Sequence, residues 1–380
     1  MNKQNLNNKI FLILMLLVSG VFLIKLVLNT NEYNYVDNRM SYRFNMPNIK
    51  QILSGEYQTI TEETIADQMP KYNYFKLSYL KLVNYLSIST INIFNLDKPN
   101  KYINIDGINL YKNYLLYGKT TDEQFKKSAK KDIGEINNIV SNTNANIYLY
   151  FIETDTNINF EDNSKVNVFP YLKENLDIPE DNIASFEINS FDDYKKYFYK
   201  TDHHWNHIGS YKGYTEIAKM MHFDNILKPK NEECFDNIKA YGSKAKRIAS
   251  IKIVNDTMCM YKYDYPEFDT YIDGNPHNYG HNTEELNDRN NISYSDIYGA
   301  DYAEIIFINK GNNNNKKLLI YANSYSNAIN KLIASNYKET YIIDGRYYNK
   351  KSIIEYINEK DIDDVLILAN CMLFNDSIHW

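Results

Sequence analysis

Three of the chain's seven histidines fall within five positions beside one aspartate, in "TDHHWNHIGSYKGY" (residues 201–214). Asp202 and His204 stand two positions apart, so on an extended segment their side chains point the same way and His203 points elsewhere. A carboxylate so placed can accept a hydrogen bond from one imidazole nitrogen while the other nitrogen faces a nucleophile. The spacing therefore predicts that His204 is a general base oriented by Asp202.

A candidate nucleophile occurs later in the chain, Ser324 in "LLIYANSYSNAI". It follows a short apolar segment and begins a helical one, which is the setting of a nucleophile elbow without the G-x-S-x-G signature. The N–H groups of Ser324 and Tyr325, in the first helical turn, are candidate donors to an oxyanion. Serine and asparagine are also preferred helix caps, so Ser324 taken alone is favoured as a cap.

Two other interpretations of the histidine cluster stay open. Asp202, His203, His204 and His207 are all competent metal ligands, but adjacent histidines are expected to project apart and no further ligand motif is apparent. Alternatively, Asp202 caps the following helix and the histidines pack against it. We predict neither a metal ion nor a cofactor.

The elements that must position these residues are short apolar segments alternating with helical ones. Such alternation implies parallel strands joined by right-handed crossovers, and therefore an α/β sandwich. Ligands in these sheets bind at the carboxyl ends of the strands, where Ser324 and Asn370 lie. The predicted strands are 145–153, 316–322, 339–344 and 364–370, and the predicted helices are 126–142, the segment after the histidine cluster, 326–335 and 351–360.

Other parts of the chain break this rhythm. Residues 222–310 are polar and rich in loops, with strand-like segments at 248–254 and 257–263, and are predicted to form a cap on a main domain that spans 101–380. Residues 31–100 are expected to pack on that domain, with a helix at 54–70 and a helix running into a strand over 76–94. The three cysteines lack metal-ligand spacing, and a Cys234–Cys259 disulfide is permitted in an oxidising compartment.

The N-terminus carries an apolar segment, residues 10–28, that is about long enough to cross a bilayer once. Lysines precede it and acidic residues follow it, which predicts a cytoplasmic N-terminus. No small-x-small cleavage site follows. We therefore predict an uncleaved membrane anchor within residues 1–30, with the rest of the chain outside the cytoplasm; a cleaved signal peptide is the alternative.

The net charge of −6, without a stripe of Lys or Arg, argues against nucleic acid as a partner.

The segment "YKTDHHWNHIGSYKGY" resembles the signature of the DHHW protein family, named after the tetrapeptide at 202–205. That family is similar to the AlgX/AlgJ group of polysaccharide O-acetyltransferases in the SGNH hydrolase-like superfamily. The group's Thr-Asp-x-His-Trp pattern matches Thr201, Asp202, His204 and Trp205, and its later Ser-Tyr turn matches Ser324 and Tyr325. The resemblance runs from Asp37 to the C-terminus and is weak between about 222 and 310.

The resemblance implies an SGNH hydrolase-like three-layer sandwich with a parallel sheet. It also implies that Ser324 is the nucleophile, His204 the base and Asp202 its orienting carboxylate. One departure is Asn323, because DHHW relatives usually carry aspartate there. Residues expected to bind substrate or an oxyanion are Tyr325, Asn323, Asn370, Trp205 and His203.

The activity so implied is a glycan O-acetyltransferase or acetylesterase of the cell envelope that works through an acyl-serine. Its partners would be a cell-surface polysaccharide or other glycan and a multi-pass membrane acyltransferase that supplies acetyl groups. The competing hypothesis is a non-catalytic envelope protein that binds glycan or acts as a scaffold, and Asn323 favours it.

Overall fold

The computed structural model describes residues 3–28, 33–34, 39–43, 46–47, 49–69, 71–94, 101–105, 107–248, 255–277, 286, 291–371 and 380. The chain divides into two compact units. The smaller unit covers residues 1–98 and 245–252, and the larger unit covers 99–244 and 253–380.

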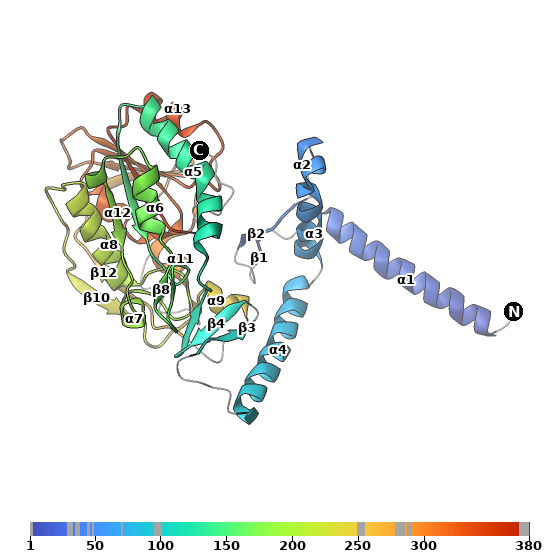
Figure 1. Cartoon of the computed structure of the whole chain (residues 1–380). Coiled ribbons are helices and arrows are strands. Elements are labelled where there is room, and N and C mark those ends of the chain that lie inside the picture. Colours follow the sequence, from blue (N-terminus) through green and yellow to red (C-terminus); the bar gives the residue numbers. More distant parts are fainter. Residues whose placement is uncertain are drawn as a thin grey trace. The chain divides into compact units, whose positions relative to one another are not determined.

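The smaller unit is mainly helical (Figure 1). The sequence prediction of a strand near residue 94 is wrong, because a single helix, α4, runs from Tyr72 to Phe94. Its β-branched C-terminal residues favour a strand locally, but extending an existing helix costs less than starting a new element. The other elements are α1 (Lys3–Val27), α2 (Ile49–Ser54), α3 (Glu56–Gln68), β1 (Tyr33–Asn34) and β2 (Arg39–Met40).

Within the described part of the chain, no helix combines the length and apolar character that a bilayer crossing requires. The expected membrane anchor is therefore not found there. The membrane location, and the packing of residues 31–100 on the main domain, stay predictions.

The larger unit is built on an eight-stranded sheet with the order β14-β13-β16-β18-β17-β19-β6-β9. The five strands from β18 to β9 are parallel, as the alternation predicted, but β14, β13 and β16 pair antiparallel, so the sheet is mixed. The strands are β6 (Asn146–Ile152), β9 (Ile183–Phe186), β13 (Phe268–Ile272), β14 (Asn275–Pro276), β16 (Glu304–Asn309), β17 (Lys317–Ala322), β18 (Glu339–Ile343) and β19 (Asp364–Ala369).

Helices cover both faces of this sheet. Alternate residues of β17 and β19 point to opposite faces, as the two-residue repeat of a strand requires. Leu319 and Ile367 pack in one cluster with α5 and α13, whereas Ile320 and Leu366 pack in another with α8 and α12. The result is a three-layer α/β arrangement. The main helices are α5 (Asp122–Asn142), α6 (Val168–Asn175), α7 (Phe191–Tyr197), α8 (His207–Met220), α11 (Tyr294–Tyr298), α12 (Asn330–Ala334) and α13 (Ile353–Lys360).

The segment predicted to be a cap is only partly separate from the sheet. Its strands β13, β14 and β16 extend the sheet edge, because β16 pairs along β18. The rest forms small sheets, β10 (Asn231–Cys234) with β12 (Cys259–Lys262) and β11 (Lys239–Ala240) with β15 (Asn291–Ile292), together with α9 (Ser243–Arg247). Cys234 and Cys259 face each other across β10 and β12 and form the permitted disulfide. Most of the strand predicted at 248–254 lies outside the described residues.

The remaining short elements of the larger unit are a three-stranded sheet, a hairpin and two 3₁₀-helices. They are β3 (Ile103–Ile105), β4 (Ile108–Tyr111), β5 (Tyr114–Leu116), β7 (Ile158–Asn159), β8 (Ser164–Lys165), η1 (Glu180–Asn182) and η2 (Ser324–Ala328).

Candidate active site

Ser324 lies at the carboxyl end of central strand β17, where the chain turns into η2. Asn323 shapes the turn: its Oδ1 accepts a hydrogen bond from the Tyr325 N–H at 3.2 Å, and its Nδ2 donates to Asn370 Oδ1 at 3.2 Å. Asn370 follows the neighbouring strand β19, so two adjacent strand ends meet behind the serine. The Tyr325 N–H was predicted as an oxyanion donor, but it donates to Asn323 in this cap. Of the two N–H groups predicted, the Ser324 N–H therefore stays the candidate oxyanion donor.

His204 connects the two sequence motifs. Its Nε2 lies 2.8 Å from Ser324 Oγ, and its Nδ1 lies 2.5 Å from Asp202 Oδ1. Its ring stacks on Tyr294 at 3.8 Å, with the two planes within 1° of parallel. If Nδ1 donates its proton to the carboxylate, Nε2 carries the lone pair that can accept the serine proton. The structure thus brings Ser324, His204 and Asp202 together in the order that a base-activated serine requires.

Asp202 remains a carboxylate although it is buried. Burial opposes its ionisation, but the neighbouring His204 and His203 and the hydrogen bonds from His204 hold the pKa of Asp202 well below its usual range. Oδ1 accepts from the backbone N–H of His204 at 3.0 Å, and Oδ2 accepts from the Ser243 N–H at 2.8 Å. Both oxygens are therefore held by donors, which gives the side chain one orientation.

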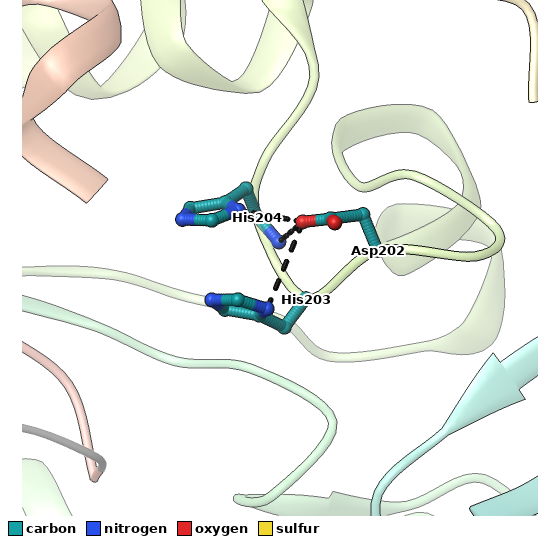
Figure 2. A group of neighbouring side chains, drawn as sticks. All are labelled: Asp202, His203 and His204. Atoms are coloured by element: carbon teal, nitrogen blue, oxygen red, sulfur yellow. Dashed lines mark hydrogen bonds and ion pairs between the residues drawn. The ribbon is translucent and has the colours of Figure 1, made fainter. Parts of the chain in front are cut away.

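The prediction that His203 and His204 point apart is wrong. Their ring centroids lie 3.9 Å apart, and Figure 2 shows both imidazoles facing the Asp202 carboxylate. Residues 201–204 form a bend and not an extended segment, so the alternation expected for a strand does not apply. The Nδ1 of His203 lies 2.6 Å from Ser243 Oγ, and burial together with the neighbouring His204 ring lowers the pKa of His203 to about 3.

A distant segment holds this bend, and the sequence carried no signal for it. This segment, the clamp, consists of Gly242 and the first two residues of α9, Ser243 and Lys244. The Gly242 N–H donates to Thr201 Oγ1 at 2.9 Å, next to the bond from Ser243 to Asp202. A Cβ on Gly242 would lie 2.3 Å from Asp202 Cβ, so only glycine fits. From the other side, Asp256 accepts from the backbone N–H groups of Lys200 and Thr201 at 2.7 and 2.8 Å.

A buried ion pair anchors this clamp. Lys244 follows Ser243 directly and is completely buried. Its Nζ lies 2.6 Å from Asp155 Oδ2 and 3.0 Å from the Tyr194 hydroxyl oxygen. A buried charge that loses its partner is strongly destabilising, so this pair holds the clamp to the segment that follows β6.

Two further predicted residues, Trp205 and Tyr325, are buried and pack beneath the catalytic side chains' segments rather than lining open space. Trp205 is fully buried, so it has no surface to offer a substrate, and its predicted binding role is replaced by packing. Gly213 of α8 makes room for it, since a Cβ there would lie 2.6 Å from Trp205 Cζ3. Tyr325 is also buried, and its hydroxyl donates to the backbone carbonyl of His203, which ties the serine turn to the histidine bend.

One group of side chains at this site could hold a metal ion. Ligand atoms of Asp202, His203 and His204 lie within 4.8 Å of one another (Figure 2). His207, the fourth ligand considered from the sequence, instead lies 2.5 Å from Glu232 Oε1 through its Nε2. Both nitrogens of His204 face other groups, so a metal bound through this ring would displace Ser324 from Nε2 or Asp202 from Nδ1.

Comparison with known proteins gives the fold class. No protein-family model matches the chain, and no curated protein sequence matches it. Among solved structures, Bacillus cereus PatB1 with a sulfonyl adduct is similar: it is 22% identical with a TM-score of 0.57, over 72% of this chain and 98% of PatB1. A DHHW family protein from Eubacterium siraeum is 17% identical with a TM-score of 0.52, over 73% of this chain and 95% of that one.

The resemblance to the DHHW family read from the sequence is therefore confirmed at the level of the fold. The O-acetyltransferase domain of Pseudomonas putida AlgJ is more distant, at 9% identity and a TM-score of 0.40.

Proposed function

We propose that the larger unit is a serine-dependent O-acyltransferase or esterase that acts on a glycan of the cell envelope. The observation that carries this proposal is the double contact of His204, 2.8 Å to Ser324 Oγ and 2.5 Å to Asp202 Oδ1. A serine hydroxyl is a poor nucleophile until a base removes its proton, and a base works best when a third group orients it.

In the first step, Ser324 Oγ attacks the acetyl carbonyl of a donor ester while His204 Nε2 takes the hydroxyl proton. His204 then returns this proton to the departing donor oxygen, and an acetyl-serine remains. In the second step, His204 removes a proton from a sugar hydroxyl, or from water in an esterase, whose oxygen attacks the acetyl-serine. The acetyl group leaves on that oxygen, and the proton returns to Ser324.

Two further facts support the proposal. PatB1 was solved with a sulfonyl adduct, and sulfonyl reagents modify activated nucleophiles such as a base-paired serine. The Cys234–Cys259 disulfide agrees with a compartment outside the reducing cytoplasm, where an envelope glycan is found. The acetyl donor and a membrane acyltransferase partner stay predictions from the resemblance.

The test is covalent labelling. The full chain is incubated with para-nitrophenyl acetate, and intact mass and a peptide map are recorded. We expect one added acetyl group on Ser324, absent in Ser324→Ala and in His204→Ala but present in Ser326→Ala, a buried serine two residues away. No adduct and no ester turnover in a folded protein would contradict the mechanism and favour the non-catalytic glycan-binding hypothesis.

The clustered ligand atoms of Asp202, His203 and His204 favour a second candidate, a metal-dependent hydrolase. The two functions differ in their response to chelation. Under the serine mechanism, ester turnover survives dialysis against EDTA and the purified chain holds no stoichiometric Zn²⁺. A loss of turnover on chelation that Zn²⁺ restores would favour the metal mechanism instead.

A further inference from the structure

A cavity of about 250 Å³ lies in the larger unit and takes no part in the chemistry described above. Its walls are formed by strand β12 and the residues after it, by helices α8, α11 and α12, and by the 3₁₀-helix η2. Its lining includes His207, Tyr261, Tyr263, Tyr298, Asn327 and Lys331.

This cavity borders the candidate active site through three separate segments. In η2, Asn327 follows Ser324 by three residues, about 6 Å at the rise of a 3₁₀-helix. His207 follows His204 by three residues at the start of α8. Tyr298 packs on Tyr294 with ring centroids 4.8 Å apart, and Tyr294 stacks on His204. A molecule in the cavity is therefore a near neighbour of the reacting serine.

The chemistry of the walls suits a ring with an apolar face and polar edges. Tyr261 and Tyr263 lie two residues apart at the end of β12, and both are partly exposed. The ring of Tyr261 meets the His207 ring edge to face at 4.8 Å. Aromatic side chains with hydroxyl groups bind partners that are apolar on one side and polar on the other, as sugar rings are.

His207 supplies a buried hydrogen-bond acceptor that the protein leaves unused. Its Nε2 pairs with Glu232 Oε1 at 2.5 Å, while its Nδ1 is buried and has no partner among the described residues. Burial lowers the pKa of His207 and so disfavours the charged ring, while the hydrogen bond and the charge of Glu232 oppose this shift. With the proton on the nitrogen that faces Glu232, Nδ1 carries a lone pair and needs a donor. Solvent does not reach this atom in the structure, so a ligand hydroxyl becomes its donor only when the His207 ring turns toward the cavity.

We propose that this cavity is a subsite for one sugar ring of the acceptor glycan, stacked on Tyr261 and donating a hydroxyl hydrogen bond to His207 Nδ1. The assignment as an acceptor subsite rests on the glycan acyl transfer proposed above. The volume of the cavity is below the roughly 300–1,000 Å³ of pockets for drug-sized ligands, which suits a single sugar ring and not a longer segment of glycan. The next sugar ring of the glycan would then lie toward Ser324.

Saturation-transfer NMR on the full chain tests the proposal, with N-acetylglucosamine, N-acetylmannosamine and glucose as separate probes at millimolar concentration. We expect transfer to at least one of them, and at least tenfold weaker binding in Tyr261→Ala and in His207→Phe, which keeps a ring but removes the acceptor. Tyr261→Leu keeps apolar bulk and serves if Tyr261→Ala does not fold. The matched control is Tyr347→Ala, an exposed tyrosine outside the cavity. No transfer to the wild-type chain from any probe, or equal transfer in the cavity variants, would overturn the subsite.

The same measurement on Ser324→Ala separates this proposal from the proposed activity, because sugar binding in the cavity does not require the serine hydroxyl. If Ser324 never takes an acetyl group but sugar binding depends on Tyr261, the acyl transfer fails and the sugar site stands. If acetyl-serine forms and no sugar binds, the subsite fails and the acyl transfer stands.

Discussion

The serine turn (residues 323–325) and the histidine bend (residues 201–204) meet at two hydrogen bonds, from His204 to Ser324 and from the Tyr325 hydroxyl to the His203 carbonyl, but they are held in different ways. The serine turn is placed by the end of central strand β17, by its own cap residue Asn323 and by Asn370 on the next strand. The histidine bend is not part of a strand or helix. It is held by Ser243 and Asp256, 41 and 55 residues away from the groups that they contact.

This difference teaches which half of the site is vulnerable. A regular strand positions the serine through many backbone hydrogen bonds, so a single substitution shifts it little. The bend depends on a few hydrogen bonds with the clamp. Each of these bonds contributes a large part of the orientation of Asp202 and His204. Substitutions in the clamp should therefore affect activity out of proportion to their distance from Ser324.

The largest expected effect tests the bend itself. His204→Ala removes the proposed base and should lower ester turnover about 10²–10⁴-fold, the usual contribution of general base catalysis. His203→Ala should cost roughly tenfold or less, because His203 contacts Ser243 and not Ser324. Steady-state rates with para-nitrophenyl acetate give both values. Equal losses would mean that the two histidines act together, as in a metal site.

The second prediction tests the clamp. In Gly242→Ala, the new Cβ would meet the Cβ, Cα and Oδ2 of Asp202, so the loop or the aspartate must move. Such overpacking costs about 1–3 kcal/mol of unfolding free energy, and ester turnover should fall further because His204 loses its orientation. Gly134→Ala is the control, since nothing lies within 4 Å of a Cβ there and it sits in helix α5. Urea unfolding and ester turnover of both variants test this prediction. If Gly242→Ala had the stability and turnover of the wild type, the bend would not need the clamp.

The third prediction concerns pH. The pKa of His203 falls to about 3, first because burial disfavours the charged ring and then because His204 repels it. Between the unfolded pKa near 6.5 and pH 3, the unfolded chain binds a proton that the folded chain does not, so stability decreases as the pH falls. The loss from this group should be about 2 kcal/mol between pH 6.5 and pH 5, at about 1.4 kcal/mol per pH unit.

Asp202 does not contribute in that window, because its pKa is well below the usual range and its stabilisation is lost only in stronger acid. Urea unfolding of the wild type and of His203→Gln at pH 6.5 and pH 5 separates the terms. The same pH dependence in both proteins would remove His203 as its source.

The smallest effect is expected on the serine side. Asn323→Ala removes one helix cap, which typically costs about 1 kcal/mol, while strand β17 continues to place Ser324. Acetylation of Ser324 should therefore slow by less than it does in Gly242→Ala. Thermal unfolding and the rate of acetyl-serine formation provide the comparison. A larger loss in Asn323→Ala would reverse the contrast between the two halves of the site.

Much of the larger unit was readable from local patterns. Strands β6, β17, β18 and β19 and helices α5, α8 and α13 lie within a few residues of their predicted positions, because each buries a continuous apolar segment or stripe. Strands β13 and β16, next to the edge strand β14, were assigned to a cap, because their burial depends on a sheet built from remote segments. The direction of His203 was mispredicted because an extended geometry was assumed for a bend.

By itself, the sequence determined the alternation that makes the α/β sheet and the placement of Ser324 after a buried strand. It also determined the pairing of Asp202 with His204 as partners, since apolar periodicity and a two-residue spacing are local properties. Only the tertiary structure decided that His204 reaches Ser324, that Gly242 and Ser243 close on Asp202, and that His203 faces the same carboxylate. The contacts of Ser324 with His204 and of Ser243 with Asp202 join residues 120 and 41 positions apart, so they exist only once the helical layers and the sheet have packed together, and the bend that they hold turns His203 toward its neighbour Asp202.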